Sequence, residues 1–419
     1  MWKIFWQLRA FELLSVTSSR AFSSALTWHY IKNPGDSATA SYVLSLYFLT
    51  KTLSGLLLSP LGDRNKKSYI LLLCALISIT APLILLMALE QGIHYFTVAA
   101  LAGIILLGVS DSLVSPTIAA TIPQIITSEL ITKAMHRKFT IDSIGGTLAI
   151  AVGIISLDNI GLTHTLSLIS AVGFFNTVLI SRTLSSIPRS TSHEGSYTQN
   201  LIEGFFLSYR FRFEFRWNTI AALANFAVTP LISIIIPYIA QYYWHGEAWK
   251  IIQLEAVLSL GILISATLVY PKLNKHNIKK ETIVRTSWIA LPTLFLSLCF
   301  TQNFIIWNAI IFSVGIAIIC NNIAIESTRT LAIPAACMAR IQTIHHVFIL
   351  ALIPLGFAIT GFALQKWGLE HAMLLLSATI AMAWLLLRTA PKMTELLSLD
   401  NESLVGAYER LFPPETGDK

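Results

Sequence analysis

The 419-residue sequence contains few charged residues for its length. Only 12% of its residues are Asp, Glu, Lys or Arg, whereas 54% are hydrophobic. A soluble core of this length could not bury so much apolar surface, so the composition predicts a protein of the lipid bilayer. The net charge of +7 therefore calls for no nucleic-acid partner.

Cysteines and catalytic motifs are equally sparse. The four cysteines (Cys74, Cys299, Cys320 and Cys337) lack CxxC or metal-ligand spacing, which predicts reduced, structural thiols. No HExxH, GxSxG or GxxxxGKS/T pattern is present, and no loop gathers carboxylates. We therefore expect no metal site and no cofactor, and the alternative of a membrane enzyme or sensor is disfavoured.

Long apolar windows dominate the chain instead. Since a spanning helix needs about 20 apolar residues, these windows predict twelve membrane spans. They lie at residues 8–30, 39–59, 69–89, 96–118, 141–158, 163–183, 218–243, 250–270, 283–301, 304–326, 341–364 and 370–388. The chain is therefore predicted to be an all-α integral membrane protein with two groups of six helices.

Basic residues are distributed unevenly among the predicted loops. With a cytoplasmic amino terminus, only Lys32, Lys250 and Lys366 of the 29 Lys and Arg residues face outward, and Arg20 and Lys51 lie inside spans. The positive-inside rule then places both termini in the cytoplasm. No small-residue cleavage site follows the first basic residues, so the first helix is expected to be retained. We expect a monomeric, multi-pass protein of the bacterial inner membrane.

Two polar segments flank the second group of spans. Residues 184–217 form a predicted cytoplasmic linker, in which Tyr209–Arg216 alternates aromatic and basic residues. A nucleic-acid platform is the alternative, but beside a span this alternation favours aromatic residues in the membrane interface and Arg on anionic lipids. Residues 391–419 are predicted to form a cytoplasmic tail, which from Thr394 onward is expected to be a short amphipathic helix at the cytoplasmic surface, without chemistry of its own.

An internal repeat relates the two groups of spans. Gly35 and Gly246, Pro60 and Pro271, and Ile122-Pro123 and Ile333-Pro334 are all related by a shift of 211 residues. Two parallel, pseudo-symmetric six-helix bundles follow, at residues 1–183 and 218–390, because six is an even number of spans. At this shift Asp111 is paired with Asn322.

The charged turn between the second and third spans reads Leu61-Gly62-Asp63-Arg64-Asn65-Lys66-Lys67. It resembles the G-x-L-x-D-R-x-G-R-R/K loop of the major facilitator superfamily, although Ser59 and Lys66 replace the two glycines. The resemblance implies the major facilitator fold, with substrate bound near the midplane between the halves and alternating access. It also implies a cytoplasmic gate of Asp63, Arg64, Lys67 and Arg340. A solvated turn that only anchors orientation is the alternative.

A second string is similar to the superfamily branch that contains the enterobactin and macrolide exporters. It runs through Ile333-Pro334, Arg340, Ile353-Pro354-Leu355-Gly356 and Gly361. The resemblance implies export of a siderophore-like compound. Two departures argue against ordinary drug/proton antiport. Ile104 occupies the position of an expected Arg in helix four, and Gly145-Gly146-Thr147 replaces a proline-containing motif in helix five.

Ionisable and amide side chains inside spans are candidate functional residues, because charge near the bilayer centre costs several kcal/mol. The predicted substrate and proton cavity is lined by Glu12, Arg20, Asp111, Asn225 and Asn322, with Lys51, Glu255 and Glu326 in second rank. Glu12 could instead snorkel into headgroups, and Arg20 could form a structural ion pair with Glu12 or Asp111.

These residues suit a secondary transporter. A buried carboxylate can carry a proton, and Arg binds carboxylate-bearing substrates in a bidentate manner. The sequence thus predicts proton-coupled export of a small polar or anionic molecule, with a siderophore-like compound as the expected substrate. Multidrug efflux, and import of the same class of metabolite, are the alternatives.

Overall fold

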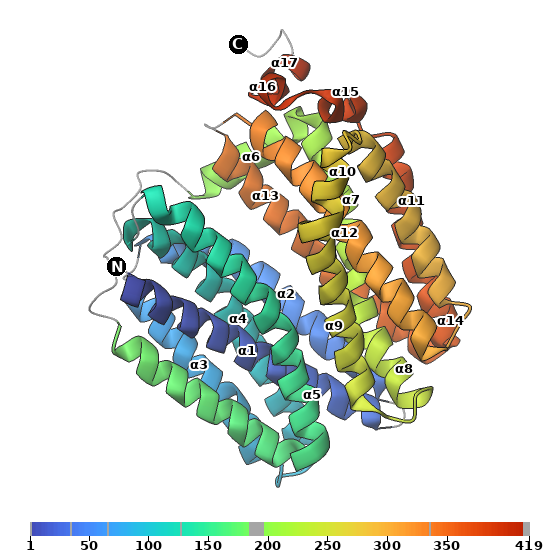
Figure 1. The fold of residues 1–419 in the computed structure, drawn as a ribbon. Helices are drawn as coiled ribbons and strands as arrows, with labels where there is room; N and C mark the ends of the chain where they lie inside the picture. The colour runs from blue at the N-terminus through green and yellow to red at the C-terminus, as the bar shows by residue number, and fades with distance from the viewer. Residues whose placement is uncertain are drawn as a thin grey trace. The chain divides into compact units, whose positions relative to one another are not determined.

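A computed structural model describes residues 2–33, 36–64, 67–125, 128–183, 197–334 and 337–413. All regular elements in these ranges are helical (Figure 1). Contacts divide the chain into two compact units. Unit 1 contains residues 1–194 and 236–252, and unit 2 contains residues 195–235 and 253–419.

Unit 1 is built from long apolar helices that follow one another along the chain. They are α1 (Trp2–Lys32), α2 (Ser37–Arg64), α3 (Lys67–Ala88), α4 (Ile93–Ile125), α5 (Ser128–Ser181) and the short α8 (Ile236–Tyr242). Helix α1 packs against α5, α4 and α2, while α3 packs against α4 and α5. Phe5, Phe11, Leu71 and Val114 are buried together in one apolar cluster, so α1, α3 and α4 share a core.

Unit 2 contains the remaining helices. They are α6 (Tyr197–Arg210), α7 (Arg212–Pro230), α9 (Ala248–Ile264, whose first turn belongs to unit 1), α10 (Tyr270–Lys275), α11 (Lys280–Leu298), α12 (Phe304–Ala332), α13 (Met338–Ala351), α14 (Ile353–Arg388), α15 (Met393–Ser398), α16 (Asn401–Leu404) and α17 (Ala407–Leu411). Two π-helical turns, Leu231–Ile235 and Ser265–Val269, follow α7 and α9. Helix α7 packs against α14, and α11 packs against α12 and α14.

Two glycines interrupt the longest helices. Gly161 in α5 has φ 78° and Gly368 in α14 has φ 81°, and each ends one helix and starts another. Glycine adopts this region without the steric penalty of a Cβ. The two turns are 207 residues apart and match the predicted breaks between the fifth and sixth spans of each half.

Close glycine contacts repeat in the same way. A Cβ on Gly153 would lie 2.3 Å from the Ala21 carbonyl oxygen, so α5 touches the backbone of α1. A Cβ on Gly356 would lie 2.3 Å from the Phe226 carbonyl oxygen, so α14 touches α7 in the same manner. Each unit therefore joins its first and fifth spans through a glycine.

The second and fourth spans of each unit also meet at a glycine. A Cβ on Gly108 would lie 2.9 Å from the Tyr47 carbonyl oxygen, and one on Gly315 would lie 2.6 Å from that of Leu258. Gly108 and Gly315 are 207 residues apart, whereas Tyr47 and Leu258 are 211 apart. If the helices are aligned by these glycine contacts, which we call the packing frame, the 207-residue shift pairs Asp111 with Ile318. The predicted pairing with Asn322 is therefore wrong by about one helical turn.

Within the described residues, eight segments are long and apolar enough to cross a membrane. One of them, residues 149–181, contains the turn at Gly161, and another, residues 340–388, contains the turn at Gly368. Helices α1 and α11 are of spanning length but more polar. Large apolar side chains such as Leu57 and Phe174 are exposed on the helices, as contact with lipid requires.

The carboxyl-terminal tail differs from the prediction of one surface helix without chemistry. It forms three short helices, α15 to α17, which pack against α11 and α12. Leu396, Leu404, Ala407 and Tyr408 are fully buried. The prediction of one surface helix was wrong because the three short helices bury these apolar side chains against α11 and α12. Tyr408 also makes a polar contact, described below.

Candidate functional site

Unit 1 holds a polar group that we call the Asp111 cluster: Ser19, Tyr47, Lys51 and Asp111. The Ser19 hydroxyl donates a 2.7 Å hydrogen bond to Asp111 Oδ1, and the Tyr47 hydroxyl donates to Oδ2. Lys51 Nζ lies 3.9 Å from Oδ2. Asp111 is 7% exposed. Three helices, α1, α2 and α4, thus converge on one buried carboxylate.

The local sequence explains this convergence. Tyr47 and Lys51 are four residues apart on α2 and so lie on one face of that helix. Gly108, three residues before Asp111 on α4, allows the α2 backbone to approach closely. Lys51 Nζ also lies 5.8 Å from the centroid of the Tyr47 ring. The glycine is therefore the feature that places Asp111 within reach of both α2 side chains.

The cluster has the parts needed for protonation-linked change. An ionised carboxylate only accepts hydrogen bonds, whereas a protonated one also donates. Protonation of Asp111 would remove its attraction for Lys51 and require the hydroxyl that donates to the protonated oxygen to rearrange. Because the donors come from α1 and α2, a proton on this carboxylate would alter contacts among three helices.

Glu12 and Arg20, the other predicted cavity residues of α1, do not join Asp111 in the same way. Glu12 is buried and forms an ion pair with Arg9, one turn earlier on the same helix. Arg20 is exposed, and among the described residues it forms no ion pair with Glu12 or Asp111. Glu12 thus has a buried partner, Arg9, that was not predicted.

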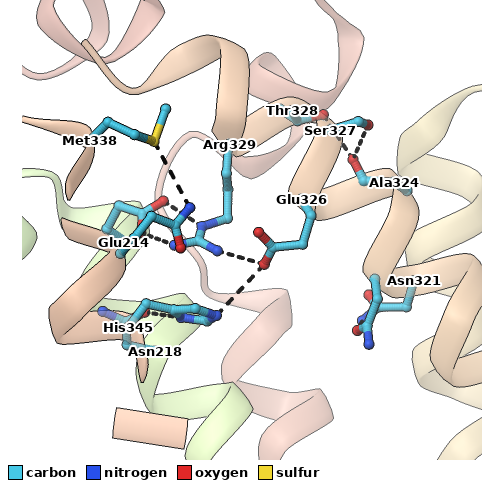
Figure 2. Close-up of polar contacts among 12 residues, drawn as sticks. Glu214, Asn218, Asn321, Ala324, Glu326, Ser327, Thr328, Arg329, Met338 and His345 are labelled. Carbon is cyan, nitrogen blue, oxygen red and sulfur yellow. Dashed lines mark hydrogen bonds and ion pairs between the residues drawn. The ribbon is translucent and has the colours of Figure 1, made fainter. Parts of the chain in front are cut away.

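Unit 2 holds a second polar group, the Arg329 cluster: Glu214, Glu326, Arg329 and Tyr408. Arg329 Nε and Nη2 each donate a 2.7 Å hydrogen bond to Glu214, and Nη1 donates a 2.5 Å bond to Glu326 (Figure 2). The Tyr408 hydroxyl donates a 2.5 Å bond to Glu214 Oε1. Arg329 and Glu214 are fully buried.

The geometry of this cluster matches charge with charge. The bidentate arginine fits the carboxylate and offsets part of the desolvation cost of both ions. Burial, with the Glu214 carboxylate beside it, raises the pKa of the Tyr408 phenol well above 10.0. The phenol therefore stays protonated and keeps its role as a donor at neutral pH.

His345 extends the Arg329 cluster on α13. Its Nδ1 lies 2.7 Å from Asn218 Oδ1, and its Nε2 lies 3.7 Å from Glu326 Oε1 (Figure 2). Glu214, Arg329 and Tyr408 are not among the predicted site residues. A charged residue near the end of an apolar run was the available signal for Glu214 and Arg329, whereas no sequence pattern marks Tyr408.

The remaining predicted cavity residues, Asn225, Asn322 and Glu255, make other contacts. Asn225 is half-buried and donates to the Ala221 carbonyl of its own helix. Asn322 is exposed and accepts a 3.1 Å hydrogen bond from Asn321, which in turn accepts one from the Trp288 indole. Glu255 on α9 is 8% exposed.

Of the predicted gate residues, Lys67 and Arg340 have described side chains. Lys67 is buried at the start of α3. Arg340, on the first turn of α13, forms a 2.9 Å ion pair with Glu203 of α6. The side chains of Asp63 and Arg64 lie outside the described residues, and the gate stays a prediction. In the part of the chain described, no group of three or more His, Cys, Asp and Glu residues could hold a metal ion.

Comparison with solved structures identifies the fold. The chain is similar to the nucleoside transporter NupG, with a TM-score of 0.65, 13% identity and coverage of 95% of this chain and 100% of that one. It is also similar to a POT peptide transporter in complex with sulfate, with a TM-score of 0.72, 14% identity and coverage of 95% and 96%. A D-xylose-proton symporter gives a TM-score of 0.70 at 10% identity, with coverage of 95% and 99%.

Sequence comparison identifies the family. No curated protein sequence matches the chain significantly. The family model described as Major Facilitator Superfamily matches residues 11–352, which is most of the chain. The resemblance seen in the charged turn is thereby confirmed at the level of the superfamily, though not for the exporter branch. The chain belongs to the Major Facilitator Superfamily, a class of membrane transporters rather than enzymes.

Proposed function

We propose that this protein is a proton-coupled secondary transporter of a small polar molecule, in which Asp111 carries the proton. The observation that carries the proposal is a buried carboxylate on α4 that accepts hydrogen bonds from hydroxyl donors on two other helices, with a lysine 3.9 Å away. A carboxylate inside the membrane is energetically costly, and its presence there therefore indicates a function.

The topology belongs to the same proposal. Twelve passes follow if α5 and α14 each cross the membrane twice, which the left-handed turns at Gly161 and Gly368 support. The uneven distribution of Lys and Arg supports cytoplasmic termini. Alternating access between the two halves is the transport mode of the superfamily.

The cationic groups of unit 1 support a polar or anionic substrate. Lys51 is partly exposed beside Asp111, and Arg20 is exposed on α1. The similar structures include transporters of nucleosides, peptides and xylose, all polar solutes. Export of a siderophore-like compound, and its location in a bacterial inner membrane, rest on the sequence resemblance and remain part of the proposal, with multidrug efflux and import as competing outcomes.

The test is transport by purified protein in liposomes of both orientations under an imposed pH gradient. The probes are enterobactin for a siderophore, ethidium for a drug, and uridine, dialanine and D-xylose for polar metabolites. We expect the pH gradient to drive at least one probe against its own concentration gradient, whether the probe moves in the same direction as the protons or in the opposite direction. Asp111→Asn should remove this accumulation and leave membrane insertion intact.

Asp158→Asn is the matched control, because Asp158 on α5 forms a partly exposed ion pair with Lys32, the last residue of α1. It should transport as the unmodified protein does. Gradient-driven transport by Asp111→Asn at the unmodified rate would refute the assignment of the proton carrier. Accumulation of ethidium alone would replace the metabolite class with drug efflux.

A further inference from the structure

A basic cavity lies in unit 2 between α6, the start of α13 and the carboxyl-terminal tail. Its volume is about 940 Å³, which is within the range of small-molecule sites. Four of its lining residues are basic (Arg210, Arg212, Arg340 and Lys392), and one, Glu203, is acidic. The lining residues therefore carry a net charge of +3 at neutral pH. Glu395, outside the lining, forms a 2.9 Å ion pair with Lys392, and the remaining positive charge still favours an anionic ligand.

Helix α6 is fixed in place beside this cavity. A Cβ on Gly204 would lie 2.8 Å from the Arg340 carbonyl oxygen, so α6 touches the α13 backbone. The Phe205 ring stacks on Phe348 of α13 at 6.5 Å between centroids. The Arg340 side chain returns to α6 through its ion pair with Glu203. The basic cavity is thus part of a packed structure and not a loose loop.

The outer face of α6 is apolar and exposed. Ile202, Phe206 and Tyr209 recur at helical spacing, and Phe206 and Tyr209 are 65% and 63% exposed. Phe206 and Tyr209 also line the cavity. An apolar stripe continuous with a basic pocket is the surface that an amphipathic interfacial helix presents to acyl chains and anionic headgroups.

The tail closes the other side of the cavity. Leu411, Phe412 and Pro413 are lining residues. Phe412 packs against Tyr408 at 5.9 Å between ring centroids, and Tyr408 donates to Glu214. A ligand in the cavity would therefore touch the segment that completes the Arg329 cluster.

We propose that this cavity binds the phosphate headgroup of an anionic phospholipid, whose acyl chains lie along Ile202, Phe206 and Tyr209. The basic residues supply charge-assisted donors for phosphate, and the exposed apolar stripe favours a lipid over a free phosphate ion. The proposal depends on membrane residence and is independent of proton transfer at Asp111.

The test measures binding to purified protein in detergent by native mass spectrometry and by the shift in thermal unfolding temperature. The probes are phosphatidylglycerol, phosphatidylcholine and inorganic phosphate. We expect phosphatidylglycerol to bind and to raise the unfolding temperature, and the other two to do neither at the same concentration. Arg210→Gln with Lys392→Gln should weaken phosphatidylglycerol binding about 25-fold, or about five-fold for each lost charge.

Lys272→Gln with Lys275→Gln is the matched control, since both residues are exposed at the end of α10 and lie outside the cavity lining. This variant removes the same charge and should bind phosphatidylglycerol unchanged. Equal losses in both double variants, or retained binding in the cavity variant, would overturn the site. Equal stabilisation by inorganic phosphate would overturn the lipid as its ligand. If the double variant does not fold, Arg210→Gln and Lys392→Gln are measured singly.

Discussion

Unit 1 and unit 2 join their helices through the same glycine contacts but carry buried charge in different places. In the packing frame set by those glycines, every member of the Asp111 cluster has an apolar counterpart in unit 2. The pairs are Ser19 and Ala224, Tyr47 and Leu258, Lys51 and Ile262, and Asp111 and Ile318. The two units therefore share these packing contacts, whereas among the aligned pairs the polar side chains at this position are present in unit 1 alone.

The difference between the clusters is one of compensation. Glu214 receives two hydrogen bonds from Arg329 and one from Tyr408, so its charge is matched by a buried cation in bidentate contact. Asp111 receives two neutral hydroxyl donors, and its nearest cation is 3.9 Å away and partly exposed. The comparison indicates a structural role for the Arg329 cluster, in which a buried cation matches the buried carboxylate.

The largest expected effect comes from breaking the compensated cluster. Arg329→Met leaves Glu214 and Tyr408 buried without the guanidinium, and loss of one partner of a buried pair costs about 3–5 kcal/mol. The free energy of unfolding, measured in detergent, should fall by that amount. Arg285→Gln, which breaks an exposed pair with Glu281, should cost less than about 1 kcal/mol. Equal effects of the two substitutions would contradict the structural role.

The shared packing predicts matched effects in the two units. Gly153→Ala and Gly356→Ala each place a methyl group against a carbonyl oxygen 2.3 Å away, and overpacking typically costs about 1–3 kcal/mol. Thermal unfolding should show similar losses for both. Gly55→Ala is the control, because its Cβ meets only Ser112 at 3.9 Å. A neutral result at Gly356 with a loss at Gly153 would break the equivalence.

A smaller effect is expected from Tyr408→Phe, which removes one donor to Glu214 but leaves Arg329 in place. A hydrogen bond to a charged group contributes about 1.5–3 kcal/mol, and the remaining arginine contacts place the loss at the lower end. Because the folded-state pKa of Tyr408 is raised, its contribution is present below pH 10 and is lost as pH rises further. The variant should therefore lose less stability above pH 10 than the unmodified protein.

The measurement is the unfolding free energy as a function of pH for both proteins. If the unfolding free energies of the two proteins fall in parallel above pH 10, Tyr408 ionises as an exposed tyrosine does. That result would contradict the buried contact with Glu214.

Much of the fold was predictable from composition and periodicity. The apolar windows anticipated the helices, whereas the two equivalent bundles at residues 1–183 and 218–390 stay a prediction, since the observed units divide the chain differently. The repeated Gly and Pro residues near the helix ends gave a shift of 211 residues, whereas Gly108 and Gly315 are related by 207. The four-residue difference could not be predicted, because close packing at these two glycines sets the register of the helices. This is why the sequence paired Asp111 with Asn322 one turn away from Ile318.

The site was predicted in part. Depth alone selected Asp111 and Lys51, which the structure brings together, because an intramembrane charge is informative without its partners. Depth also selected Glu12, whose partner Arg9 stands one turn away, and Arg20, which is exposed. Tyr408 contacts Glu214 across 194 residues of sequence, and no local pattern encodes such a long-range contact.

The most direct test of Asp111 as the proton carrier separates substrate movement from proton coupling. Substrate counterflow in liposomes without a pH gradient, and accumulation driven by a pH gradient, are measured for Asp111→Asn with the transported probe. We predict that counterflow persists while gradient-driven accumulation disappears. Accumulation at the unmodified level, or loss of counterflow and accumulation to the same extent, would contradict the assignment.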